Sequence, residues 1–163
     1  MFLALHEIGS HYTYAKVPYD EWFTAMFGRT LNSLFGFERN HYDRLVHFLC
    51  GFLLAIPMRE LFLRVVKARG FASYWLPFQM TMSCSALYEL MEWLSAVLFG
   101  GDLGTAFLGT QGDEWDAQKD MALAGLGAAI TMCVLAFVNR GKKHDFQEEW
   151  LEQRVPELAG RFD

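Results

Sequence analysis

The uncharged run of eighteen residues from Met121 to Val138 constrains the fold of this chain more than any other feature. A helix of about 20 mostly apolar residues spans a bilayer, whereas a soluble core built from 163 residues could cover few helices of that kind. Two further stretches, residues 44–66 and 72–99, are also long and carry few charges in their interiors. The sequence therefore predicts three membrane spans, at about 44–66, 72–99 and 120–139.

The composition agrees with a membrane protein and excludes some other classes. The chain is 53% hydrophobic and 20% charged, below the roughly 25% of charged residues in soluble domains. A net charge of -5 argues against a nucleic acid partner. The three cysteines lie inside apolar stretches, an arrangement typical of buried packing residues and not of a disulfide framework.

Basic residues predict the orientation of the spans. Four of them, from Arg59 to Arg69, lie between the first and second spans, and Arg140, Lys142 and Lys143 follow the third. Because cytoplasmic loops are enriched in Lys and Arg, we expect both groups and the C-terminus to be cytoplasmic. The predicted division is a transmembrane bundle over residues 1–140 and a cytoplasmic tail over 141–163.

The predicted fold class is all-α, a polytopic transmembrane helix bundle. Residues 20–37 have apolar side chains at helical spacing, which predicts one amphipathic helix lying in the membrane interface. An ordinary helix packed on protein is the alternative. The five apolar residues at the start are too few for a span, so we expect a truncated N-terminus with further spans upstream. The third span carries small residues suited to close helix packing, namely Ala124, Gly125, Gly127 and Ala128.

Acidic and imidazole side chains recur at the predicted outer ends of these helices, in pairs three or four residues apart. Such a spacing places both members of a pair on one helix face. Carboxylates and imidazoles that converge at one depth suit Mg²⁺, Mn²⁺, Zn²⁺ or iron, and without a cation some would have to take up protons. The predicted metal ligands are Glu7, His11, Asp43, His47, Glu89, Glu92, Asp116 and Asp120, with Asp113 one turn before Asp116.

Roles in catalysis follow from the same pairs. We predict general acid or base groups among His47, Glu89, Glu92 and Asp116. Arg39 and Arg44 could pair with these acids or bind an anionic headgroup or phosphate, which makes them predicted substrate contacts.

Simpler explanations exist for each pair taken alone. Asn40 and Asp43 have the spacing of a capping box. Asp116 and Asp120 begin a helix, where the dipole favours acids. Glu89 and Glu92 could extend into lipid headgroups. The joint convergence of the pairs is therefore the observation on which a shared site depends.

Four segments of the chain, "ALHEIGSHYTY", "RNHYDRLVHF", "ALYELMEW" and "FLGTQGDEWDAQKDM", resemble the YjdF-type inner membrane proteins, a bacterial family without an assigned reaction. The resemblance covers roughly residues 3–140. It implies a multi-pass protein of the bacterial inner membrane, with about five or six spans in a complete chain.

A more distant similarity is to the VanZ-like membrane proteins. Asp43, Arg44, His47 and Phe48 match the D-K-x-x-H-F start of one span in that family. Glu89 and Glu92 match its E-x-x-Q element only in part, because glutamate replaces glutamine. This resemblance implies a role in the cell envelope.

Three functions stay open on the sequence alone. The first is an outer-face site, possessing a divalent metal, that acts on a lipid-linked or phosphate-bearing envelope substrate. The second is an ion- or proton-coupled transporter. The third is a non-catalytic accessory subunit or scaffold, with a membrane protein or a second copy of the chain as its partner.

Overall fold

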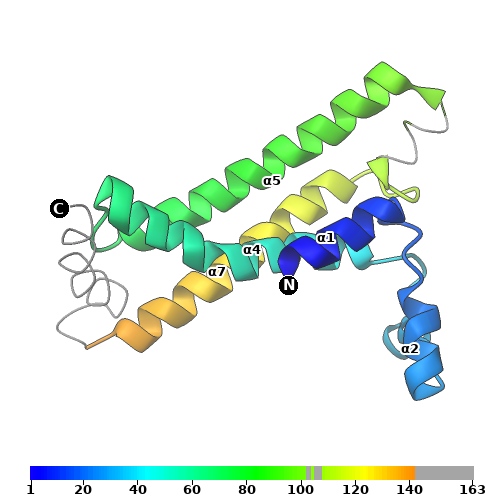
Figure 1. Cartoon of the computed structure of the whole chain (residues 1–163), viewed down its shortest axis with the longest axis horizontal. Coiled ribbons are helices and arrows are strands. Elements are labelled where there is room, and N and C mark those ends of the chain that lie inside the picture. The colour runs from blue at the N-terminus through cyan, green and yellow to red at the C-terminus, as the bar shows by residue number, and fades with distance from the viewer. Residues whose placement is uncertain (102–103, 105–107, 142–163) are drawn as a thin grey trace, which may run out of the picture.

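The computed structural model describes residues 1–101, 104 and 108–141, and every regular element in this part of the chain is helical. The elements are α1 (Phe2–His11), α2 (Tyr19–Phe27), α3 (Leu31–Phe35), α4 (Tyr42–Leu61) with the π-helical turn η1 (Phe62–Val66), α5 (Ala72–Phe99) and α7 (Asp116–Asn139). Figure 1 shows α4, α5 and α7 as the long helices. The predicted all-α class is confirmed. Residues 142–163 of the predicted tail lie outside the described part of the chain.

Among the described helices, α7 is the one that is long and apolar enough to cross a membrane. The other two predicted spans correspond to α4 with η1 and to α5. Charged residues stand near both ends of α4, and serine, threonine and aromatic residues interrupt the apolar sequence of α5. Three spans therefore stay a prediction, with α7 as the segment that the hydropathy of the described helices supports.

Helices α4 and α7 run in the same direction and their backbones are in contact. A Cβ atom added to Gly51 would overlap the carbonyl oxygen of Ala124, and one added to Gly127 would overlap the carbonyl oxygen of Phe48. Further along, Thr131 donates a hydrogen bond to the carbonyl of Phe52 at 2.8 Å. The small residues predicted to mediate close packing thus hold α4 against α7, which brings the N-terminal ends of the two helices together.

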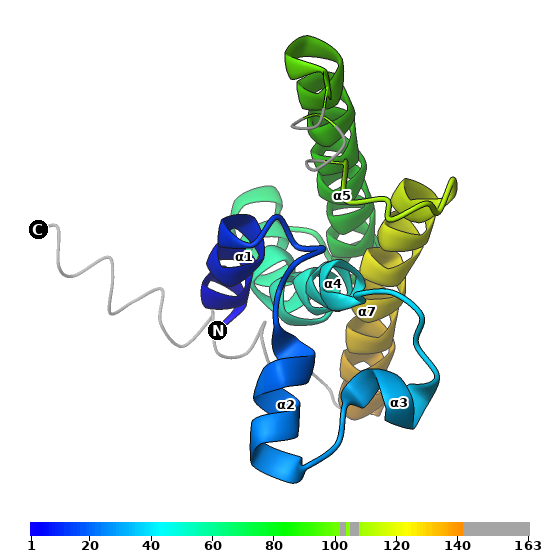
Figure 2. The ribbon, with the colours of Figure 1, turned by 90° about the vertical axis from the view of Figure 1, so that its right-hand side faces the viewer.

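Helix α5 crosses this pair in the opposite direction. Ser73 lies beside Arg59 near the C-terminal end of α4, and Ser85 lies beside His47 near its N-terminal end. Met82 covers Gly125 of α7. The C-terminal end of α5 projects away from α4 and α7 in both views (Figures 1 and 2). The first part of α5 therefore completes the three-helix packing.

The distribution of side chains is the reverse of that in a soluble protein. Small and polar residues such as Ala55, Ala128 and Thr81 are buried between the helices. Large apolar residues are exposed, including Leu94, Leu98 and Phe137. Lipid can cover such a surface at no hydrophobic cost, whereas water cannot, so the arrangement is typical of helices packed within a membrane.

The single amphipathic helix predicted over residues 20–37 is two helices in the structure. Gly28 ends α2 with a φ of 70°, in the left-handed region that favours glycine. Thr30 then begins α3, its hydroxyl oxygen accepting a hydrogen bond from the backbone N–H of Ser33. Figure 2 shows α2 and α3 together at one end of the molecule. The apolar spacing predicted the helical conformation, and the glycine divides it.

Candidate functional site

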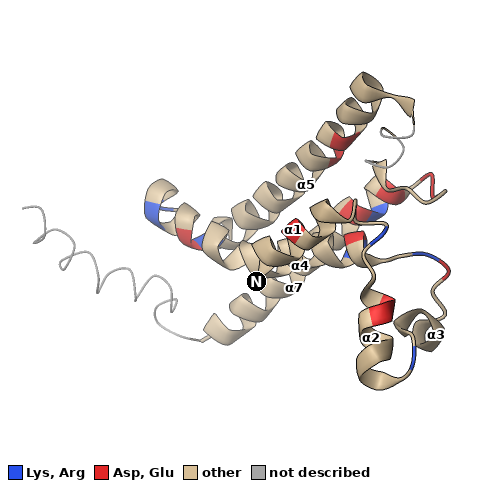
Figure 3. Ribbon diagram, turned by 45° about the vertical axis from the view of Figure 1, so that its right-hand side comes forward, with Lys and Arg blue, Asp and Glu red and all other residues tan. Residues whose placement is uncertain are grey.

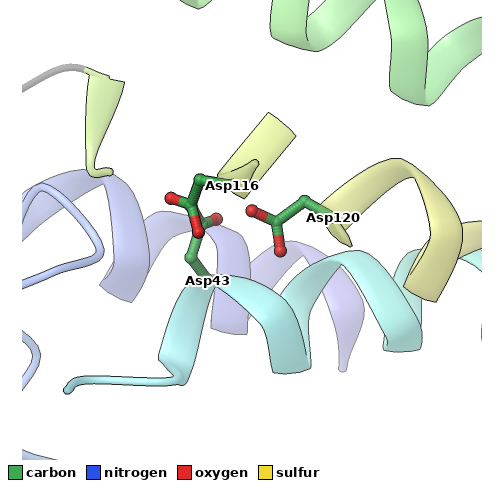
Figure 4. Close-up of side chains that lie close together, drawn as sticks. All are labelled: Asp43, Asp116 and Asp120. Carbon is green, nitrogen blue, oxygen red and sulfur yellow. The ribbon is translucent and has the colours of Figure 1, made fainter. Parts of the chain in front are cut away.

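Three aspartates from two helices converge where α4 and α7 begin. Asp43 is in the first turn of α4, and Asp116 and Asp120 are one turn apart at the start of α7. One carboxylate oxygen of each residue lies within 4.8 Å of the others. Figure 4 shows the three side chains pointing toward one another. Two oxygens on opposite sides of a bound Mg²⁺ ion lie about 4.2 Å apart, so the cluster has the dimensions of a cation site.

The three aspartates, which we call the Asp triad, are almost completely buried. Asp43, Asp116 and Asp120 are 5%, 3% and 2% exposed. One oxygen of Asp43 and one of Asp120, the Oδ1 atom in each case, has no hydrogen-bond partner within the described part of the chain. The helix dipoles favour acids at these positions by about 0.3–1 kcal/mol each, which is less than the cost of burying unpaired charge. Dipoles alone therefore do not account for the triad.

Asp116 joins the triad to a pair of arginines. Arg39 contacts both of its oxygens, with Nη1 2.8 Å from Oδ1 and Nη2 3.2 Å from Oδ2. Arg44 Nη2 lies 3.2 Å from Oδ1 of Asp116 and 2.5 Å from Oδ2 of Asp113. Asp113 also accepts a hydrogen bond from Lys119 Nζ at 2.6 Å. The site thus has acidic and basic halves, and Asp116 belongs to both.

Asp113 lies in the loop before α7, and its hydrogen-bond partners keep its carboxylate ionised. Hydrogen bonds from Lys119, from the backbone N–H of Trp115 and from Arg44 lower the pKa of Asp113 from 3.8 to about 2. At neutral pH its carboxylate is therefore an ionised partner for the two arginines.

His47 lies on the other side of Asp43, one turn further along α4. Its Nε2 atom is 3.3 Å from Oε1 of Glu89 and 3.7 Å from Oδ1 of Asp43. Its Nδ1 atom is 3.3 Å from the hydroxyl of Ser85. The imidazole is only 6% exposed. A buried histidine between two carboxylates has the surroundings of a proton-transfer group, since each contact orients the ring.

The loop before α7 is fixed to the segment before α4. The backbone N–H of Asn40 donates to Oε1 of Gln111, and Nε2 of Gln111 donates to the carbonyl of Asn40, both at 3.0 Å. The Asn40 side chain accepts from the backbone N–H of Tyr42 at 2.9 Å. It therefore stabilises the turn through Tyr42, and Asp43 is directed into the triad.

Three predicted ligands lie outside the triad and its contacts. Glu7 and His11 are exposed on α1. Glu92 lines a neighbouring cavity of about 280 Å³ together with Tyr14 and Tyr88. The structure therefore gathers Asp43, Asp116 and Asp120, with His47 and Glu89 next to them, and leaves the α1 pair apart.

Sequence reasoning missed a group of aromatic and imidazole side chains beside the site. The hydroxyl of Tyr14 lies 2.7 Å from Nδ1 of His6 and accepts a hydrogen bond from Tyr88 at 3.1 Å. The ring of Tyr88 meets that of His47 edge to face, with 5.7 Å between centroids. His6, five residues before the predicted ligand His11, was the available signal, since it lies on the face of α1 that packs toward α4 and α5.

Comparisons with known proteins agree with the membrane character of the fold. Residues 1–141 match a family described as "Predicted membrane protein (DUF2238)". The chain is 41% identical over 130 residues to "Inner membrane protein YjdF" of Escherichia coli (strain K12). That match covers 79% of this chain and 58% of the relative, so the chain corresponds to just over half of the relative's length. No solved structure matches the chain. This family match over most of the length, together with the YjdF similarity, shows that the chain belongs to the DUF2238 family of predicted membrane proteins.

Proposed function

We propose that this membrane protein binds a divalent cation at the Asp triad and uses the site to act on a lipid-linked or phosphate-bearing substrate of the bacterial envelope. One observation carries the proposal: Asp43 and Asp120 are each more than nine-tenths buried, each has an oxygen without a hydrogen-bond partner in the described part of the chain, and their carboxylates converge with that of Asp116. Like charges buried this close repel unless a cation or a proton compensates them. A bound cation supplies that compensation.

The donor set favours a hard cation. Three aspartates offer only oxygen atoms, which suit Mg²⁺ or Mn²⁺. His47, whose ring nitrogen is 3.7 Å from Asp43, lies beside this donor set and is the proton-transfer group in the proposal. Mn²⁺ fits the oxygen donor set and is the best probe.

The surrounding residues suit a phosphate group. Arg39 and Arg44 contact Asp116 and carry planar donor groups that match phosphate oxygens. His47, held by Glu89, is positioned as a general base or acid beside the cation. In this proposal Arg39 and Arg44 bind the substrate anion and His47 transfers the proton, and a cation held by the Asp triad would supply Lewis-acid polarisation of the phosphate.

The proposed side of the membrane is the outer one. Figure 3 shows acidic residues where α4 and α7 begin and basic residues around the C-terminal end of α4, at the opposite end of the helices. The basic group comprises Arg59, Arg64, Lys67 and Arg69. Because Lys and Arg are enriched on the cytoplasmic side, the triad is expected to face away from the cytoplasm.

Direct measurement of cation binding tests the proposal. We expect the detergent-purified protein to bind one Mn²⁺ per chain, measured by electron paramagnetic resonance of the free ion. Asp120→Asn should weaken binding by about 100-fold or more, because even the loss of an outer-shell partner costs about 10–100-fold. Phosphate release from a lipid phosphate substrate should fall in parallel.

Glu114→Gln is the matched control, because Glu114 is an exposed acid in the loop that precedes α7. It removes the same charge without touching the triad and should leave Mn²⁺ affinity unchanged. Wild-type protein that binds no Mn²⁺, or an equal loss of affinity in both variants, would contradict the proposal.

A further inference from the structure

Two cavities of opposite character meet beside the arginines. The first has a volume of about 550 Å³ and is lined mainly by polar groups, with Glu38 and Asp113 as well as Arg39 and Gln111 among them. The second has a volume of about 410 Å³ and is lined mainly by apolar side chains. Phe37, His41 and Arg44 line both. The cavities are therefore adjacent, and each has the size of a small-molecule site.

The polar cavity is lined by two positive charges, Arg39 and Arg44. Their η nitrogens contact Asp113 and Asp116. The Nε atoms of both arginines are buried, so an anion in the cavity would have to be bound by the η nitrogens, which it would share with the two aspartates. Two guanidinium groups at one cavity can hold a phosphate in this way.

His41 lies between the two cavities and lines both of them. Its ring contacts the ring of Phe37, with 4.3 Å between the centroids. The side chains at the boundary thus change from the arginines to an aromatic pair and then to aliphatic residues.

The apolar cavity extends from this boundary along the helices. Leu45 and Phe48 follow Arg44 on α4, and Leu123 faces them from α7. Leu45 is 48% exposed, so the cavity reaches the apolar outer surface of the helices. In a membrane protein that surface contacts lipid chains, which can enter the cavity without passing through water.

We propose that the two cavities form one binding site for a lipid with a phosphate headgroup. The phosphate lies against Arg39 and Arg44, and a hydrocarbon chain lies between Leu45, Phe48 and Leu123. This inference rests on the proposed function, since it names the substrate class of the same site and places its phosphate beside Asp116. A water-soluble phosphate would leave the apolar cavity unused, and a neutral lipid would make no use of the two arginine charges.

Equilibrium binding of fluorescent phosphatidic acid to the detergent-purified protein tests this site. Unlabelled phosphatidic acid should compete at least about tenfold better than diacylglycerol with the same chains, because charge-assisted hydrogen bonds to the phosphate are lost in the neutral lipid. It should also compete at least about tenfold better than glycerol 3-phosphate, which has the headgroup without the chains. Equal competition by either compound would overturn the inference.

A variant locates the chain within the apolar cavity. Leu45→Trp fills that cavity and should weaken phosphatidic acid binding by about tenfold or more. Leu61→Trp is the matched control, because Leu61 is a leucine of similar exposure at the other end of α4 (56% against 48% for Leu45), and it should leave binding unchanged. Equal effects of the two variants would contradict the assigned position.

Mn²⁺ binding by the same preparations separates this inference from the proposed function. If Mn²⁺ binds to the triad while phosphatidic acid shows no preference over diacylglycerol, the lipid site is wrong and the cation site stands. If phosphatidic acid binds with the expected preferences while wild-type protein binds no Mn²⁺, the lipid site stands and the cation-dependent function is wrong.

Discussion

Both ends of the α4–α7 pair bury charge, but they compensate it differently. Near the C-terminal end of α4, Arg59 is fully buried, donates a hydrogen bond to Ser73 at 3.0 Å and lies 4.2 Å above the ring of Tyr74. At the N-terminal end, Asp43 and Asp120 face another acid and each retains an unpartnered oxygen. One end places a single charge against a hydroxyl and an aromatic ring, while the other brings together three acids, of which Asp116 pairs with the arginines.

The difference indicates separate purposes for the two ends. A buried arginine with a hydroxyl acceptor and an aromatic face joins α4 to α5 and needs no ligand. A buried group of acids with too few donors is destabilising as long as the acids are charged, and a cation or protons must compensate them. The cation proposal follows from this contrast more than from the acids themselves.

The largest expected effect comes from a substitution that breaks the close contact between α4 and α7, on which both ends of the pair depend. Gly51→Leu places a side chain where the carbonyl oxygen of Ala124 lies and must separate α4 from α7. We expect a loss of about 3 kcal/mol or more in the free energy of unfolding, together with loss of Mn²⁺ binding. Chemical unfolding in mild detergent measures the first quantity.

Ala122→Leu is the control for Gly51→Leu. Ala122 is an exposed small residue on α7, so a larger side chain there meets no helix within the described part of the chain. The control should unfold like the wild type. Equal stability of the Gly51 variant and the wild type would show that the two helices do not need this close approach.

Neutralising one buried charge at each end should change the stability in opposite directions. In metal-free protein, Asp120→Asn removes like-charge repulsion and should raise the free energy of unfolding by about 1–2 kcal/mol. Arg59→Met removes a charge that has partners and should lower it by about 1.5–3 kcal/mol. Thermal melting in detergent with a chelator measures the stability of both variants. Saturating Mn²⁺ should make the wild type more stable than Asp120→Asn, the reverse of their order without metal. If both substitutions destabilised the metal-free protein, the two ends of the α4–α7 pair would not differ in how they compensate buried charge.

Much of this arrangement follows from residue spacing. Asp116 and Asp120 share a helix face because they are four residues apart, and small residues one and two turns later predict the close packing that brings Asp43 to them. The uncharged run predicted α7 itself. These features are local or depend on one helix contact, and sequence patterns report both.

Other features depend on contacts that spacing does not encode. The inward face of α1 is set by the ring of Tyr14, which fills the space beside Gly9, and this contact turns Glu7 and His11 outward. The division of residues 20–37 depends on the left-handed conformation of Gly28. The orientation of α1 depends on tertiary packing and the division of residues 20–37 depends on backbone conformation, so apolar periodicity could not predict either.

The smallest expected effect concerns Asp113, which links the two arginines outside the triad. Its pKa is lowered from 3.8 to about 2, so ionised Asp113 stabilises the folded protein above pH 3.8, and this contribution disappears as the pH falls toward 2. Asp113→Asn should therefore melt at a lower temperature than the wild type at pH 6, with the difference vanishing near pH 2. Glu114→Gln, in the same loop, should show no such dependence on pH. A difference that persists unchanged at pH 2 would mean that Asp113 acts through its shape and not its charge, and the arginines would then need another anion to balance them.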